Sequence, residues 1–224
     1  MIKKILTFVL GLFLVVGLTA CGSSDKKDVL AHTETFLTAC RDGDFAKAEK
    51  FCSTETANTL KITNFKETLM NTFTKSLETS EIKFSDYSET TKKAASNFID
   101  DVLKAIIRSY QMNDDYNNDK KTVSAVVEYL DVNSFSTIQM TATMRNLVTD
   151  YTNAHKSELQ AIYTSKGRSE MLKSIIDGVA PDYFKKVKTD YLDKMPAKKQ
   201  KWIMTLVKKD KTWVINKIII TDNT

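Results

Sequence analysis

The stretch Lys208-Lys209-Asp210-Lys211-Thr212-Trp213-Val214-Ile215 lies close to the C-terminus and is the clearest β signal in the chain. Its lysine-rich centre, Lys209 to Lys211, is typical of a tight turn between two strands. Before the turn, apolar residues alternate with polar ones at Trp202, Met204 and Leu206, and after it β-branched residues accumulate at Ile218 to Ile220. We therefore expect an antiparallel hairpin at the C-terminus.

A second β signal precedes this hairpin, because Thr122 to Val132 is dense in valine and includes Tyr129. Most of the remaining chain has apolar residues at helical spacing. The expected helices cover residues 29–40, 44–52, 62–77, 95–110, 144–162, 171–179 and 181–195, with Pro181 in the first turn of the last one. Ser80 to Glu89 fits a short strand or an extended connector.

The composition agrees with a folded domain rather than a disordered chain. Of 224 residues, 42% are hydrophobic and 27% are charged, and only six are glycine and two are proline. We expect an α+β fold in which an N-terminal helical hairpin and further amphipathic helices pack on a small antiparallel sheet. No internal repeat or long linker divides the chain, so residues 28–224 are expected to form a single domain.

The N-terminus has the pattern of a secretory signal peptide. Lys3 and Lys4 precede the apolar stretch Ile5–Val16, which is followed by Leu18-Thr19-Ala20-Cys21. These four residues resemble the lipobox of bacterial lipoproteins. The resemblance implies that Leu18, Thr19 and Ala20 direct processing, that residues 1–20 are removed, and that Cys21 receives a diacylglyceryl group. An ordinary cleaved signal with a chance cysteine is the alternative.

The lipobox leads to an expected location. Residues 21–27 would be a lipidated cysteine with a short tether, which holds the domain on the outer face of the bacterial cytoplasmic membrane as an extracellular lipoprotein with diacylglycerol and palmitate. Without residues 1–20 the side chains carry a net charge of +3. That charge favours loose contact with anionic envelope material, but it excludes nucleic acid as an expected partner.

Two cysteines remain after Cys21. Cys40 and Cys52 lie in a compartment that permits disulfides. The expected helix from Asp44 to Cys52 would rise ~12 Å, whereas a disulfide requires Cα atoms within ~7 Å of each other. We expect two buried free thiols. A disulfide between them is the alternative if the two helices cross sharply.

Two further segments resemble a known superfamily. Residues 36–48, Phe-Leu-Thr-Ala-Cys-Arg-Asp-Gly-Asp-Phe-Ala-Lys-Ala, look like the opening helices of small, uncharacterised Gram-positive lipoproteins with a nuclear-transport-factor-like, cystatin-like cone domain, and residues 208–215 look like their last hairpin. Helices between about 139 and 195 exceed the minimal cone. The resemblance implies a cavity, for which Phe36, Tyr129, Trp202 and Trp213 are candidate lining residues. Ordinary core packing is their alternative role.

Catalytic and metal-binding patterns are sparse. Histidine occurs only at His32 and His155, and the chain has no HExxH, CxxC, GxSxG or phosphate-binding glycine motif. The loop Asp115–Asp119 resembles the start of a calcium loop but lacks its glycine and its bidentate glutamate. We therefore assign no catalytic residue, no metal ligand and no cofactor.

These observations favour a membrane-anchored, non-enzymatic binding domain whose partner is a protein, a peptide or an envelope polymer. One alternative is an enzyme that acts on a small hydrophobic molecule in a cone cavity, with His32 or a buried carboxylate as base. Another is an accessory component of a secretion or conjugation apparatus, because related cone domains occur there.

Overall fold

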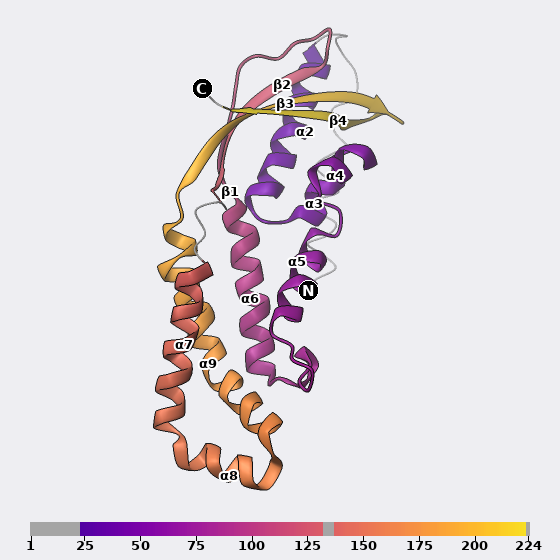
Figure 1. Cartoon of the computed structure of the whole chain (residues 1–224). Helices are drawn as coiled ribbons and strands as arrows, with labels where there is room; N and C mark the ends of the chain where they lie inside the picture. Colours follow the sequence, from indigo (N-terminus) through magenta and orange to yellow (C-terminus); the bar gives the residue numbers. More distant parts are fainter. Residues whose placement is uncertain (1–22, 132–136, 223–224) are drawn as a thin grey trace, which may run out of the picture.

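The computed structural model describes residues 23–131 and 137–222, in which helices pack against a four-stranded antiparallel sheet. The sheet lies at one end of an elongated molecule, and long helices extend from it toward the other end (Figure 1). The expected α+β class with a small antiparallel sheet is confirmed.

An N-terminal helical hairpin is formed by α2 (Ser23–Arg41) and α3 (Phe45–Glu49), as the sequence predicts. Gly43 between them has φ +75°, and the Asp44 side chain caps α3 by accepting a hydrogen bond from the Lys47 amide. The first helix begins earlier than expected. Residues 23–27, expected as part of a tether, form the first turns of α2.

The next segment contains one helix more than the sequence suggests. In place of a single helix over 62–77, the chain forms α4 (Thr54–Leu60) and α5 (Phe65–Ser76). Ser53 starts α4 because its side chain accepts a hydrogen bond from the Thr56 amide. Lys61 ends α4 in the left-handed region, with φ 57°.

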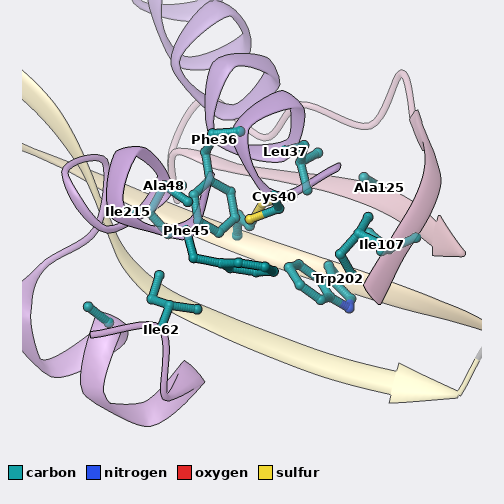
Figure 2. Close-up of a cluster of buried hydrophobic side chains, with 14 of the residues drawn as sticks. Phe36, Leu37, Cys40, Phe45, Ala48, Ile62, Ile107, Ala125, Trp202 and Ile215 are labelled. Atoms are coloured by element: carbon teal, nitrogen blue, oxygen red, sulfur yellow. The ribbon is translucent and has the colours of Figure 1, made fainter. Parts of the chain in front are cut away.

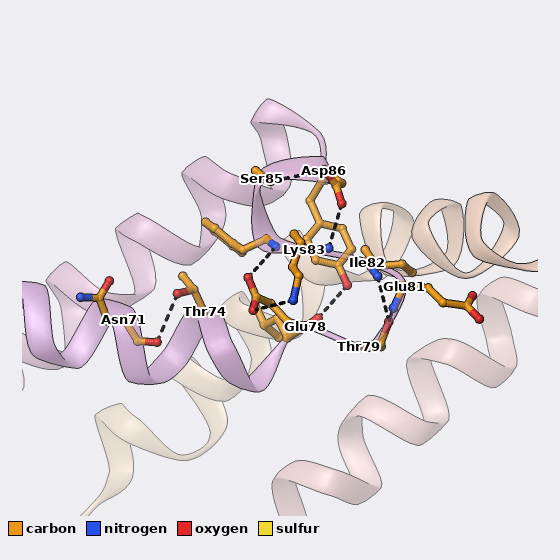
Figure 3. Close-up of polar contacts among 12 residues, drawn as sticks. Asn71, Thr74, Glu78, Thr79, Glu81, Ile82, Lys83, Ser85 and Asp86 are labelled. Carbon is orange, nitrogen blue, oxygen red and sulfur yellow. Dashed lines mark hydrogen bonds and ion pairs between the residues drawn. The ribbon is translucent and has the colours of Figure 1, made fainter.

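The connection from α5 to the next helix is not a strand but an extended segment with a 3₁₀ turn, η1 (Phe84–Asp86). Side chains hold its backbone in place (Figure 3): Glu78 accepts from the Phe84 amide at 3.1 Å, Thr79 from the Ile82 amide at 3.1 Å, and Asp86 from the Lys83 amide at 2.8 Å. These bonds satisfy backbone donors that neither helix nor sheet pairs.

Helix α6 (Glu89–Ile106) passes directly into strand β1 (Ile107–Met112). Ile107 and Tyr110, expected as the end of the helix, therefore lie on a strand. The apolar spacing continues across this junction, but pairing with the neighbouring strand β2 (Thr122–Leu130) determines the backbone conformation. A register shift between Ile107 and Ser109 marks the transition.

Strands β3 (Ala197–Lys209) and β4 (Thr212–Asp222) form the expected C-terminal hairpin and complete the strand order β1-β2-β3-β4. Asp210 and Lys211 in the turn both have positive φ, at 49° and 68°, which is the geometry of a type I′ turn. Trp202 on β3 lies opposite Ala125 on β2 and Ile220 on β4.

A helical arm lies between β2 and β3 in the chain and comprises α7 (Thr137–Ala154), α8 (Lys156–Lys166) and α9 (Arg168–Asp190). Figure 1 shows α7 and α9 side by side, with α8 at the tip farthest from the sheet. Pro181 does not begin a helix as expected but lies inside α9, where packing against α6 and α7 outweighs the hydrogen bond that proline removes.

The buried apolar residues form two clusters that share α6. The sheet, α2 and α3 enclose the first, to which α6 contributes Ile99 and Leu103. The second joins α6 to α9, where the rings of Phe98 and Phe184 stack with centroids 5.4 Å apart. Helix α6 thus links the core at the sheet to the core of the arm.

Candidate functional site

An apolar cavity of about 220 Å³ lies between the N-terminal helices and the inner face of the sheet. Residues of helices α2 to α6 and of all four strands contribute to its wall, and most of their side chains are aromatic or aliphatic. The lining residues are Phe36, Cys40, Phe45, Leu60, Lys61, Ile62, Phe65, Ile106, Ile107, Tyr129, Gln200, Trp202 and Ile220.

Helix and strand periodicity place these side chains. Phe36 and Cys40 are four residues apart on α2 and therefore share the face that packs on the sheet. Gln200 and Trp202 are two residues apart on β3 and point to the same side of the sheet. Figure 2 shows Phe45 from the helical hairpin reaching toward Trp202, with Phe36 above them and Ile107 beside the indole.

Three of the four aromatic residues singled out from the sequence line this cavity. Phe36 and Trp202 have ring centroids 6.5 Å apart, and Tyr129 lies on the neighbouring strand β2. Trp213 is not a lining residue. It lies opposite Lys208 near the hairpin turn, with the Lys208 Nζ 5.4 Å from its ring centroid, and the seven residues to Ile220 span about 23 Å of strand.

Several lining residues were missed from the sequence. Phe45, Ile62 and Phe65 come from the α3 to α5 region, whose fold depends on a cap at Ser53 that was not recognised. Ile220 was not readable either, because counting from the turn at Asp210 and Lys211 would place Ile219 opposite Trp202. A register shift between Thr205 and Leu206 brings Ile220 there instead.

The thiol in the cavity wall, on Cys40, favours its protonated form. Burial raises the pKa of the Cys40 thiol well above its usual range, and the nearby Cys52 adds to the shift. Burial, with the charge of Glu49, raises the pKa of Cys52 to about 12. Both cysteines are free thiols in the structure. Neither supplies a thiolate nucleophile near neutral pH.

One polar group in the cavity wall is under-satisfied. Trp202 is only 8% exposed, and its buried indole Nε1 has no hydrogen-bond partner among the described residues. A buried donor left unpaired costs about 1–3 kcal/mol. Further polar lining groups belong to Lys61 at the end of α4, to Tyr129 on β2 and to Gln200 on β3.

Two surface grooves border the cavity and share wall residues with it. A groove of about 350 Å³ runs between α4 and β4 and shares Leu60, and another of about 420 Å³ lies between α3 and α5 and shares Ile62 and Phe65. Both are larger than the cavity. Their walls, however, include charged side chains that water solvates well, such as Glu55 and Lys217 in the first groove. The wall of the apolar cavity includes a single charged side chain, Lys61, and we therefore take the cavity as the candidate ligand site.

The polar candidates from the sequence lie outside the cavity. His32 packs edge-on against Phe51, with its Nε2 3.2 Å from the Phe51 carbonyl oxygen, and burial lowers its pKa despite that hydrogen bond. His155 stacks on Tyr151 with ring centroids 4.0 Å apart. The Asp115 carboxylate accepts hydrogen bonds from the Ser124 amide and hydroxyl.

Within residues 23–131 and 137–222, no three His, Cys, Asp or Glu side chains gather closely enough to hold a metal ion.

In the same part of the chain, no helix has both the length and the apolar content to cross a bilayer.

The fold and the site together give an α+β structure with a small apolar cavity between its N-terminal helices and its sheet. Comparisons with models of known protein families, with curated proteins and with solved structures gave no match for this chain.

Proposed function

We propose that this protein is a lipid-anchored extracytoplasmic lipoprotein, and that its domain binds a small apolar ligand or apolar side chain in the cavity between α2 and the sheet. The observation that carries the binding role is the cavity itself, in which Phe36, Tyr129 and Trp202 from three separate elements meet. Aromatic and aliphatic walls with a few polar groups are typical of small-molecule sites.

The cavity favours binding over catalysis. Its described lining residues include neither a carboxylate nor an imidazole, and the raised pKa of Cys40 keeps the thiol protonated. His32, the base considered for an enzyme, instead packs against Phe51. General acid–base chemistry needs a group within hydrogen-bond reach of the reacting atoms. The wall instead offers apolar contacts.

The dimensions and polar groups of the cavity suggest the ligand class. An apolar cavity of roughly 150 Å³ is large enough for benzene, so about 220 Å³ suits a short acyl chain or a single substituted ring. Lys61 provides a cation and Gln200 an amide at the wall. A ligand with one apolar body and one anionic or hydrogen-bond-accepting end matches both features.

The anchor is supported by the sequence Leu18-Thr19-Ala20-Cys21. Helix α2 begins at Ser23, two residues after Cys21, so a lipid on that sulfur would be attached almost directly to the folded domain. Two buried acyl chains hold a protein stably at a bilayer, whereas one is marginal.

Tryptophan fluorescence tests the binding role, because the chain has two tryptophans and only Trp202 lines the cavity. In a Trp213→Phe variant of the full chain, Trp202 is the sole reporter. Titration with hexanoate, hexanol and hexylamine then compares one apolar body with three different ends. We expect saturable changes in the millimolar range or below, with hexanoate binding more tightly than hexylamine because of Lys61.

The converse variant serves as the control. A Trp202→Phe protein keeps only Trp213, about 23 Å along the hairpin from Ile220, and its fluorescence should not respond to hexanoate. Equal responses of both variants, or no saturable response of Trp202 to any of the three probes, would overturn the binding site.

A further inference from the structure

The start of α2 is fastened to the two loops at the sheet end of the molecule. Asp25 pairs with Lys121 at 3.1 Å and with Lys208 at 3.8 Å, and Lys26 pairs with Asp114 at 3.5 Å. The first turns of α2 therefore lie beside the loop 113–121 and the β3–β4 turn. Cys21 precedes Ser23 by two residues, and two residues of extended chain reach only ~7 Å.

The tip of the helical arm lies at the opposite end. Helix α2 is about 28 Å long, and its C-terminal turn at Gly43 packs on α6 at Leu103. From there α6 leads away from the sheet to its first turn, where Ser88 and Thr91 bond to Asp177 on α9. Helix α9 then continues nine residues, about 13 Å, to Arg168 beside α8. In Figure 1, α2, α6 and α9 are met in that order on the way from the sheet to α8.

We propose that the lipoprotein stands upright on the membrane. The surface formed by the first turns of α2, the loop 113–121 and the turn 209–212 rests on the lipid headgroups, and α8 lies up to about 60 Å from the bilayer. This inference rests on the lipid anchor of the proposed function. It adds a defined membrane-facing surface and leaves the arm tip as the part of the domain that reaches farthest into the envelope.

Charge at the membrane-facing surface suits phosphate headgroups without dominating the contact. Lys27, Lys120, Lys209 and Lys211 are exposed there, while Asp25 and Asp114 are held in ion pairs. Exposed acids at 28, 119 and 210 keep the net charge of this surface low. The covalent lipid therefore holds the protein at the membrane, and the short connection between Cys21 and Ser23 at the start of α2 determines which end of the domain faces it.

Energy transfer from labelled sites to the membrane tests the orientation. Three matched variants of the full lipidated chain, Lys209→Cys, Lys104→Cys and Lys166→Cys, each replace one exposed lysine, at the β3–β4 turn, on α6 and at the end of α8. Each is labelled with a donor and reconstituted in phosphatidylglycerol/phosphatidylcholine vesicles that carry a headgroup acceptor. A raised pKa makes the native Cys40 and Cys52 slow to react at neutral pH, and unsubstituted protein gives the labelling background.

We expect transfer to be strongest at residue 209, weaker at 104 and close to background at 166. Equal transfer at all three sites, or stronger transfer at 166 than at 209, would overturn the upright orientation. The intact mass of the same samples separates the two proposals. If Cys21 carries lipid and the order fails, only the orientation is wrong, whereas an unmodified Cys21 contradicts the anchor itself.

Discussion

The Asp177 carboxylate on α9 accepts a hydrogen bond from the Thr91 hydroxyl on α6 at 2.7 Å, across 86 residues of sequence. The same Oδ1 accepts from the Ser88 amide at 2.9 Å, and Ser88 is the N-cap of α6. A carboxylate at the start of a helix also interacts favourably with the helix dipole. This contact therefore joins the helical arm to the N-terminus of the helix that reaches the sheet.

Removing this contact should loosen the arm. We expect Asp177→Ala to lower the free energy of unfolding by about 2 kcal/mol and Thr91→Val by about 1 kcal/mol, because each leaves a polar partner unpaired. Urea denaturation of the two single variants and the double variant measures the coupling, expected near 1 kcal/mol. Strictly additive effects would show that the two side chains do not depend on each other.

Gly43 should tolerate no side chain. Its φ is +75°, and a Cβ there would lie 2.9 Å from the backbone of Leu103 and Lys104. We expect Gly43→Ala to lower stability by about 3 kcal/mol, from backbone strain and from displacement of the α2–α3 turn. Gly167→Ala is the control, since Gly167 also has a positive φ, +88°, but open space around it. A similar shift in the urea midpoint of both variants would contradict the close approach to α6.

His32 should make stability depend on pH. Burial lowers its pKa in the folded state, so the unfolded chain binds a proton first as pH falls below about 6.5. Stability is therefore fully present above that pH and is lost as pH falls toward the folded-state pKa. In thermal melts at pH 7.5 and 5.0, wild type should lose more stability than His32→Gln. Parallel losses in the two proteins would rule out this linkage.

Ile219 and Ile220 provide a matched pair for the cavity. Both are 42% exposed, but as successive strand residues they point to opposite faces, and only Ile220 lines the cavity. We expect Ile220→Asp to weaken hexanoate binding at least tenfold, because it places a carboxylate in the apolar wall. Ile219→Asp adds the same charge on the other face and should leave binding within twofold. Equal weakening by both substitutions would place the ligand elsewhere.

Local patterns predicted much of this fold. The β3–β4 hairpin could be read from its alternation and its lysine-rich turn, and the α2–α3 hairpin from Gly43 with the cap at Asp44. Each of these elements forms from contacts between residues near in sequence, so a short window contains the information that determines it. The α+β class followed from the order of such windows.

Other features depend on distant partners. Ile107 and Tyr110 continue a helical apolar stripe, yet they become β1 because Ile107 lies opposite Tyr129 on β2. Trp213 and Trp202 look equivalent in sequence, and only the length of the hairpin separates Trp213 from the cavity. Pro181 signals a helix start in a short window, but tertiary packing keeps it inside α9.

The mass of the mature protein extracted from membranes is the most direct test of the proposed lipoprotein. Detergent-extracted chain, digested and measured by mass spectrometry, should give an N-terminal peptide that begins at Cys21 and carries a diacylglyceryl group. A Cys21→Ser variant should lack that modification and appear in the soluble fraction. Wild-type protein that retains residues 1–20, or that begins at an unmodified Cys21, would contradict the lipid anchor.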